Sequence, residues 1–304
     1  MFNIFKKNKN VVVLKKTKPG ACGGTDATQD TSAPKKIEST EMIYFSAETA
    51  LTTVVRQPED RGKLVYINAY AAPCGEGTFM YIDKRDRRTF REGGARRWAY
   101  VKKDVFPDLV GIVNEYGLAN ENGFHSRTHG LPENFGGSID IRYKSGETIS
   151  VSDNQSPVMR TEAVDRIAQY FDTAMSGENI PLPSVDSVVE IRYGETRKNG
   201  GYKKAALTLD GDKGTVRKEC RYDSPDIFKS EKELGAEAIK KIKDTIEKNG
   251  VFAWARLPKR EYGFSNDEKL TFVFEDGGEI TVYKYTDLPY DLSGAFFDIS
   301  FQLD

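Results

Sequence analysis

Short runs of β-branched and aromatic residues occur in the same order in both halves of this chain. They lie at residues 43–47, 64–70 and 78–83 in the first half and at residues 188–193, 204–209 and 215–222 in the second. Apolar side chains at a spacing of two are typical of half-buried strands. The pattern therefore predicts three strands at the start of each half.

A helical spacing follows the predicted strands in each half. The apolar residues at intervals of three and four are Phe106, Leu109 and Val113, then Ile239, Ile242 and Ile246. This spacing predicts one helix per half. Gly117 and Gly250 follow these helices and are expected to end them in the left-handed conformation. Ser230 and Glu233 match a capping box, which predicts that the second helix begins there.

Each half then closes with a predicted β-hairpin. The hairpin strands are residues 138–143 and 148–151 in the first half and residues 269–274 and 279–282 in the second. When Gly146 is aligned with Gly277, the apolar residues of the two hairpins coincide at every alternate position. Three strands, a helix and a hairpin in the same order twice predict a duplicated unit.

The two halves differ at their ends. After Pro157, an apolar stripe through Val164, Ile167 and Phe171 predicts a helix. Residues 295–301 alternate as in a strand, although the sequence does not decide between strand and helix for this segment.

This order of elements predicts an α+β fold with two tandem units. Each unit is an antiparallel sheet of three strands and a hairpin, with a helix packed on one face. Gly177 and two nearby prolines predict a linker at residues 177–183, between a first unit at 41–176 and a second at 184–304. Residues 1–40 contain few large apolar side chains and predict a disordered, basic N-terminal tail.

Composition agrees with a soluble globular protein of two domains. The chain has 304 residues, of which 38% are hydrophobic and 30% charged, with a net charge of −1. This balance argues against a surface devoted as a whole to nucleic acid or an anionic membrane. Without an apolar run of transmembrane length, a cytoplasmic protein is predicted. The alternative is a membrane-attached lipoprotein through Cys22, against which the lysines between that cysteine and a short apolar run argue.

Residues 84–103 hold nine basic side chains and two acidic ones, with aromatic residues between them. The candidate binding residues are Arg85, Arg87, Arg88, Arg91, Arg96, Arg97 and Trp98. Guanidinium groups and stacking aromatic rings suit single-stranded nucleic acid or another polyanion. The alternative is a solvated connection between strand and helix whose aromatic side chains turn into the core.

The histidines of this chain, His125 and His129, lie four residues apart in one loop. On a helix, this spacing would direct both rings towards a metal. Gly123 and Pro132 argue against a helix here, and the HExxH motif is absent. The alternatives are therefore a metal site of a hydrolase or two exposed loop histidines. Cys74 lacks a partner base in the sequence around it and is interpreted as an ordinary thiol.

Residues 116–119, 138–147 and 154–157 contain the sequences YGLA, SIDIRYKSGE and NQSP in that order. Taken together in this order, these three sequences resemble those of a group of uncharacterised tandem α+β proteins from anaerobic Gram-positive gut bacteria. The resemblance covers about one unit, and it implies no activity, cofactor or catalytic residue.

The hypothesis that these observations favour is a non-catalytic protein-interaction or binding module whose partner is another protein. No cofactor is predicted. A binder of nucleic acid or another polyanion through residues 84–103 is the first alternative, and a metal-dependent hydrolase using His125 and His129 is the second. The oligomeric state is not predicted.

Overall fold

The computed structural model describes most of the chain from residue 37 onwards. The described residues are 37–49, 64–86, 95–129, 136–197, 199–222, 225–257, 267–284, 286, 288 and 290–303. Most of the predicted N-terminal tail, including Cys22, lies outside them, as do Arg87, Arg88 and Arg91.

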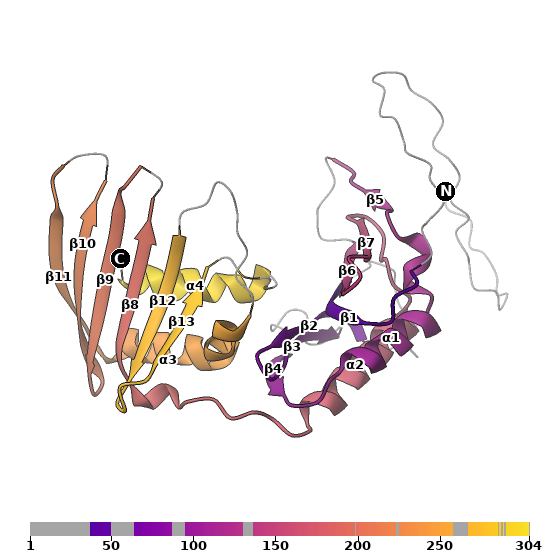
Figure 1. Cartoon of the computed structure of the whole chain (residues 1–304), viewed down its shortest axis with the longest axis horizontal. Helices are drawn as coiled ribbons and strands as arrows, with labels where there is room; N and C mark the ends of the chain where they lie inside the picture. The colour runs from indigo at the N-terminus through magenta and orange to yellow at the C-terminus, as the bar shows by residue number, and fades with distance from the viewer. Residues whose placement is uncertain are drawn as a thin grey trace, which may run out of the picture. The chain divides into compact units, whose positions relative to one another are not determined.

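The first sheet has seven strands in the order β4-β3-β2-β1-β6-β7-β5 (Figure 1). These are β1 (Met42–Thr49), β2 (Leu64–Cys74), β3 (Gly77–Asp86), β4 (Ala95–Val101), β5 (His125–Ser126), β6 (Gly137–Tyr143) and β7 (Thr148–Asp153). Neighbouring strands are antiparallel except for β5, which pairs in parallel with β7.

The second sheet has six strands in the order β11-β10-β9-β8-β12-β13, and all its neighbours are antiparallel. They are β8 (Val188–Thr196), β9 (Tyr202–Asp210), β10 (Lys213–Arg221), β11 (Phe228–Leu234), β12 (Asp267–Phe274) and β13 (Glu279–Tyr283). The chain is therefore a mixed α+β protein with two largely antiparallel sheets, as predicted.

Helices cover one face of each sheet. Those of the first half are α1 (Phe106–Glu115) and α2 (Thr161–Met175), and those of the second half are α3 (Ala236–Asn249) and α4 (Tyr290–Leu303). The 3₁₀ helices are η2 (Leu118–Glu121), η3 (Val185–Ser187) and η4 (Val251–Arg256). Within the described part of the chain, no helix has the length and apolar content needed to cross a membrane.

Each half contains a fourth strand, where the sequence predicted three. In the first half it is β4, within the basic segment. In the second half it is β11, which includes Ser230 and Glu233, so the predicted capping box is wrong and α3 begins only after Gly235. Nearly all residues of β11 are exposed, because this strand lies at the edge of the sheet. A strand that is exposed on both faces lacks the alternation of apolar and polar residues by which a strand is predicted.

The C-terminal segment that alternates like a strand forms α4. Its buried residues, at helical intervals of one, three and four, are Leu292, Ala295, Phe296, Ile299 and Leu303. Phe297 and Phe301 are exposed on the opposite side of the helix. These two phenylalanines produced the false alternation.

Gly117 and Gly250 adopt the left-handed conformation predicted for helix ends, with φ of 60° and 61°. Gly250 meets a second demand, because a Cβ atom at this position would lie 2.4 Å from Cδ2 of Trp98. No residue with a side chain fits here unless the indole moves.

The first sheet is buried on one face along its length and on the other face at β2, β3 and β4. One face packs against α1 and α2 through residues such as Phe45, Ile67 and Leu109. The other carries buried aromatic residues that share a hydrophobic cluster with the second half, and its members from the first sheet include Tyr70, Phe79, Tyr81 and Tyr100. The second half contributes Phe252 and Trp254 of η4 to the same cluster.

Polar contacts join the same surfaces. The Cys74 thiol donates to the carbonyl oxygen of Ala253 at 3.0 Å, and the indole N–H of Trp98 donates to the carbonyl oxygen of Glu247 at 2.8 Å. Residues Pro34–Asp304 accordingly form one compact unit.

Candidate binding surface on the second sheet

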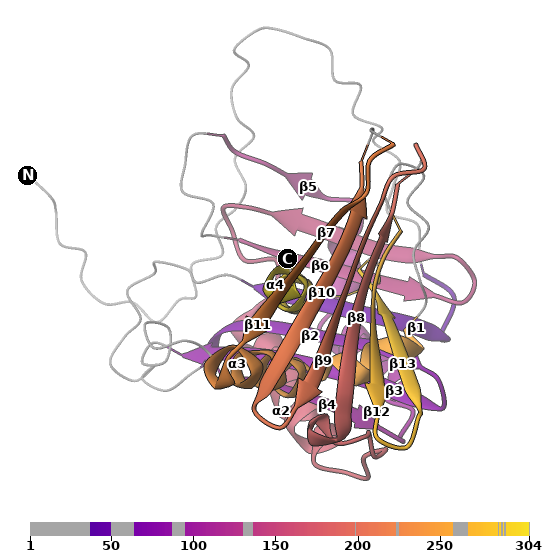
Figure 2. The same ribbon diagram turned by 90° about the vertical axis from the view of Figure 1, so that its left-hand side faces the viewer.

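The face of the second sheet opposite α3 and α4 is open. In Figure 2 it faces the viewer, and no described helix or strand lies in front of it. Ile191, Leu207 and Val216 point to the helices and are buried. The residues between them along the strands, such as Arg192 and Arg217, are exposed. This open face is the candidate binding surface.

Strand register arranges the side chains of the open face in three rows that cross the strands. The lysine row contains Lys229, Glu219, Lys204, Gly194, Lys269 and Tyr283. The arginine row contains Glu231, Arg217, Ala206, Arg192, Thr271 and Thr281. The glutamate row contains Glu233, Thr215, Thr208, Glu190, Val273 and Glu279.

The three rows differ in charge. The lysine row has three lysines and one glutamate, for a net +2, and the arginine row has two arginines and one glutamate, for +1. The glutamate row has three glutamates, for −3. Successive rows are two residues apart along each strand, or about 6–7 Å. The face is therefore polarised along the strand direction.

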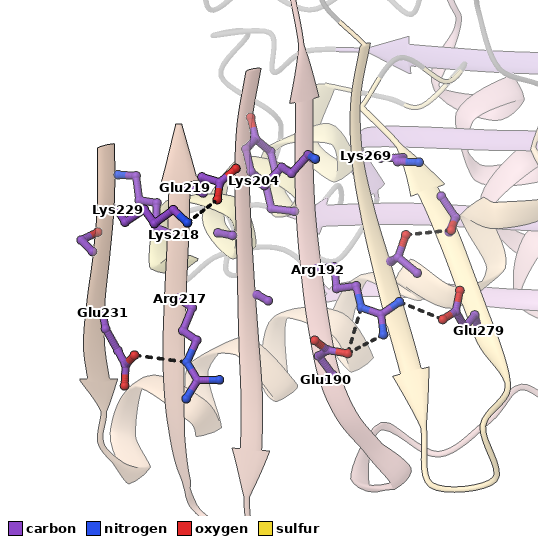
Figure 3. Close-up of a pocket in the computed structure, with 17 residues that line it drawn as sticks. Glu190, Arg192, Lys204, Arg217, Lys218, Glu219, Lys229, Glu231, Lys269 and Glu279 are labelled. Atoms are coloured by element: carbon purple, nitrogen blue, oxygen red, sulfur yellow. Dashed lines mark hydrogen bonds and ion pairs between the residues drawn. The ribbon is translucent and has the colours of Figure 1, made fainter. Parts of the chain in front are cut away.

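A hollow of about 890 Å³ lies on this face (Figure 3). Gly194 and Ala206 form its floor because they carry no long side chain, and they lie on adjacent strands in adjacent rows. The nearest atoms to a Cβ placed on Gly194 would be in the Lys269 side chain, at 3.7 Å or more. Long charged side chains form the walls, among them Lys204 and Arg217.

Ion pairs fix the arginine row. Arg192 lies 2.6 Å from a carboxylate oxygen of Glu190 and 2.9 Å from one of Glu279, as the dashed lines in Figure 3 mark. The hydrogen bond with Glu190 is the main reason that the pKa of Arg192 is raised. Arg217 donates to Glu231 at 3.1 Å.

The lysine row is only partly neutralised. Glu219 accepts a hydrogen bond from Tyr202 at 2.7 Å and pairs with Lys229 at 3.3 Å, and these contacts, with that of Tyr202 the largest, lower the pKa of Glu219. The ammonium of Lys204 lies 5.0 Å from the centre of the Tyr202 ring. Among the described residues, Lys204 and Lys269 form no ion pair.

The basic residues predicted to bind a polyanion have acidic partners wherever the structure describes them. The ion pairs are Lys84 and Arg97 with Asp172, Arg85 and Arg96 with Asp83, Lys102 with Glu178, and Lys103 with Asp108. Trp98 stacks on Phe79 with ring centres 6.3 Å apart, and its N–H bonds to the second half. Its indole therefore packs within the protein.

His125 and His129 are exposed. The Nδ1 atom of His125 lies 2.8 Å from Oγ of Ser152, in a contact that joins β5 to β7. No group of three or more His, Cys, Asp or Glu side chains that could hold a metal occurs in the part of the chain that the structure describes.

Cys74 is fully buried, and burial raises the pKa of its thiol to about 12. A thiol in this state is protonated at neutral pH and is a poor nucleophile. This agrees with its interpretation as an ordinary thiol.

Sequence reasoning did not identify the open face. The alternation at residues 188–193 and 204–209 was present in the sequence and correctly predicted strands. The rows could not be predicted in this way, because they depend on the register between strands that lie far apart in the sequence.

Comparisons with known proteins give little to set beside this geometry. No family model matches the chain, and no curated protein matches it. Among solved structures, one from Eubacterium rectale, described as a candidate DNA polymerase III beta subunit, is 10% identical with a TM-score of 0.13. The match covers 85% of this chain, and the chain spans 61% of that structure. A similarity this low supports no conclusion about fold or function.

Proposed function

We propose that this protein is a non-catalytic interaction module that binds another protein on the open face of its second sheet. The proposal rests mainly on the uncovered hollow over Gly194 and Ala206, which is bordered by rows of charged side chains. Residues held by register on a rigid sheet are suited to recognition because little conformational freedom is lost on binding.

The proposal includes a tandem organisation, with units near 41–176 and 184–304. The strands β1–β4 with β6 and β7 pair in the same order as β8–β11 with β12 and β13. The left-handed turn glycines Gly75 and Gly211 occupy the same place between the second and third strands, with φ of 60° and 61°. Gly117 and Gly250 correspond at the helix ends.

The equivalent faces of the two proposed units differ in chemistry. In the first sheet, Tyr81 lies between Tyr70 and Trp98 on the adjacent strands. In the second, Arg217 takes the same position, between Ala206 and Glu231. Small and charged residues thus replace the aromatic residues that bury the first sheet.

This difference in chemistry favours a binding surface on the second sheet over packing of that face against a further layer of helices. Burial of the arginine and glutamate rows under an apolar helical layer would remove charges from water at a large cost. A polar outer face is typical of the terminal unit of a stacked array. The second unit therefore ends the stack and leaves its open face to a polar partner.

A polyanion bound through residues 84–103 has less support, because the described basic residues there are already paired with carboxylates.

Photocrosslinking tests the proposal that the open face binds another protein. A benzophenone amino acid is placed at Thr208 on the open face, with a control at Gln169, which is exposed on α2. We expect a discrete crosslinked protein from Thr208 alone. Crosslinks from neither site, or the same products from both, would refute the proposal.

A further inference from the structure

The lysine row has a gap at its centre. Gly194 lies opposite Lys204 on one side and opposite Lys269 on the other. Two strand spacings separate the backbones of these lysines by about 10 Å. Both side chains are exposed, and both are long enough to reach over the glycine.

These two lysines differ from the other cations of the face. Arg192, Arg217 and Lys229 each have a carboxylate partner within 3.3 Å. Lys204 and Lys269 form no ion pair with a described residue. Glu219 lies opposite Lys204, but its closest charged partner is Lys229. Within 4 Å of a Cβ built on Gly194, the only described atoms belong to the Lys269 side chain. A carboxylate seated there would face both lysines and would lower the net charge of the row from +2 to +1.

The glutamate row decides what kind of anion fits. Glu190 and Glu279 lie on the same face, about 13 Å from the lysine row. Both pair with the single guanidinium of Arg192, so these three side chains together keep a net charge of −1. A chain of uniform negative charge laid along the strands would meet repulsion there. A segment with an acidic side chain at one end and basic side chains at the other meets opposite charges at both.

We propose that the partner is a protein segment of this bipolar kind, an inference that rests on the proposed function. One of its carboxylates binds between Lys204 and Lys269 over Gly194, and its basic side chains bind near Glu190 and Glu279. Complementary charge of this sort contributes mainly to specificity and to the rate of association.

The test uses three fluorescein-labelled probes in anisotropy titrations at low and physiological salt. They are a twelve-residue peptide with four glutamates followed by a glycine-serine spacer and four lysines, an all-glutamate peptide of the same length, and a twelve-nucleotide thymidine oligomer. We expect the bipolar peptide to bind best. A Lys204→Gln, Lys269→Gln double variant should bind it roughly three- to tenfold more weakly.

The matched control is Lys102→Gln, Lys103→Gln, which removes the same charge from exposed lysines on another surface. It should bind the bipolar peptide as the wild type does. Equal weakening in both variants, stronger binding of either uniform polyanion, or no binding of the bipolar peptide overturns the inference.

Repeating the Thr208 crosslinking in the Lys204→Gln, Lys269→Gln background separates the two proposals. If a crosslinked protein is present in the wild type and persists in the variant, the open face binds a partner but the lysines do not select it. If it is absent in both, the proposed function itself fails. Loss of the adduct in the variant alone supports the inference, provided that far-UV circular dichroism shows an unchanged fold.

Discussion

At Gly250, the absence of a Cβ atom is required both by the backbone conformation and by the packing between the two halves. Its φ of 61° is unfavourable for residues with a side chain, and its Cα faces the Trp98 indole. A Gly250→Ala substitution adds a methyl group 2.4 Å from Cδ2 and 2.7 Å from Cε2 of that ring. The indole cannot turn away freely, because Phe79 stacks against it and Glu247 accepts its N–H.

The expected cost of Gly250→Ala has two separable parts. Left-handed conformation costs an alanine about 1–2 kcal/mol. Displacement of the packed indole adds about 1–3 kcal/mol for overpacking, and loss of its hydrogen bond adds about 1 kcal/mol. Unfolding free energy should therefore fall by about 3–6 kcal/mol, a large part of the total for a domain.

Gly117→Ala is the matched control. Gly117 has the same φ, but the methyl group would meet only the side-chain amide of Asn120, at 2.5 Å. Asn120 is exposed and can rotate, so only the conformational part, about 1–2 kcal/mol, should remain. Urea unfolding followed by circular dichroism at 222 nm measures both variants, and the difference should be about 2–4 kcal/mol.

A double-mutant cycle with Trp98→Ala identifies the source of that difference. Without the indole, Gly250→Ala should cost no more than Gly117→Ala. If the two glycine variants are equally destabilised, or if Trp98→Ala leaves the cost of Gly250→Ala unchanged, the reasoning about this contact is refuted.

Three further predictions concern buried and exposed ionisable groups. The Cys74 thiol should react with N-ethylmaleimide at pH 8 only after unfolding. The unfolded thiol loses its proton near pH 9.0 and the folded one near pH 12. Between these values the free energy of unfolding should therefore fall by about 1.4 kcal/mol per pH unit. A Cys74→Ala variant whose free energy of unfolding falls equally fast with pH would contradict this. Asp83→Asn, which removes a fully buried carboxylate paired with two arginines, should cost about 2–4 kcal/mol in urea unfolding, whereas Asp172→Asn, at a side chain 38% exposed, should cost less than about 1 kcal/mol. Mass-spectrometric metal analysis should find the same metal content in wild type and in His125→Ala, His129→Ala; stoichiometric zinc lost in the variant would instead establish a metal site.

Local patterns in the sequence were sufficient for the elements that have one buried face. Ile139, Ile141 and Ile149 alternate in the hairpin of β6 and β7, and all three are buried as this pattern predicts. The stripe through Val164, Ile167 and Phe171 likewise predicted α2. Here side-chain periodicity and burial follow directly from one another.

Elements with a different environment were missed or misassigned. In β4, Trp98 and Tyr100 alternate with Arg97 and Ala99, but the high density of arginine suggested a solvated segment. Both faces of that strand are occupied by packing or ion pairs, which local composition does not reveal. The same limit applies to the open face, where Gly194 and Ala206 become neighbours only through strand register.

The aromatic face of the first sheet has a consequence for synthesis of the chain on the ribosome. Tyr100 is translated about 150 residues before Trp254, which belongs to the cluster that covers it. At about 5–20 residues per second, the nascent first half emerges with this face uncovered for on the order of ten seconds. Premature termination between residues 177 and 183 would release a product with a permanently exposed aromatic sheet, and such a fragment should aggregate or engage chaperones.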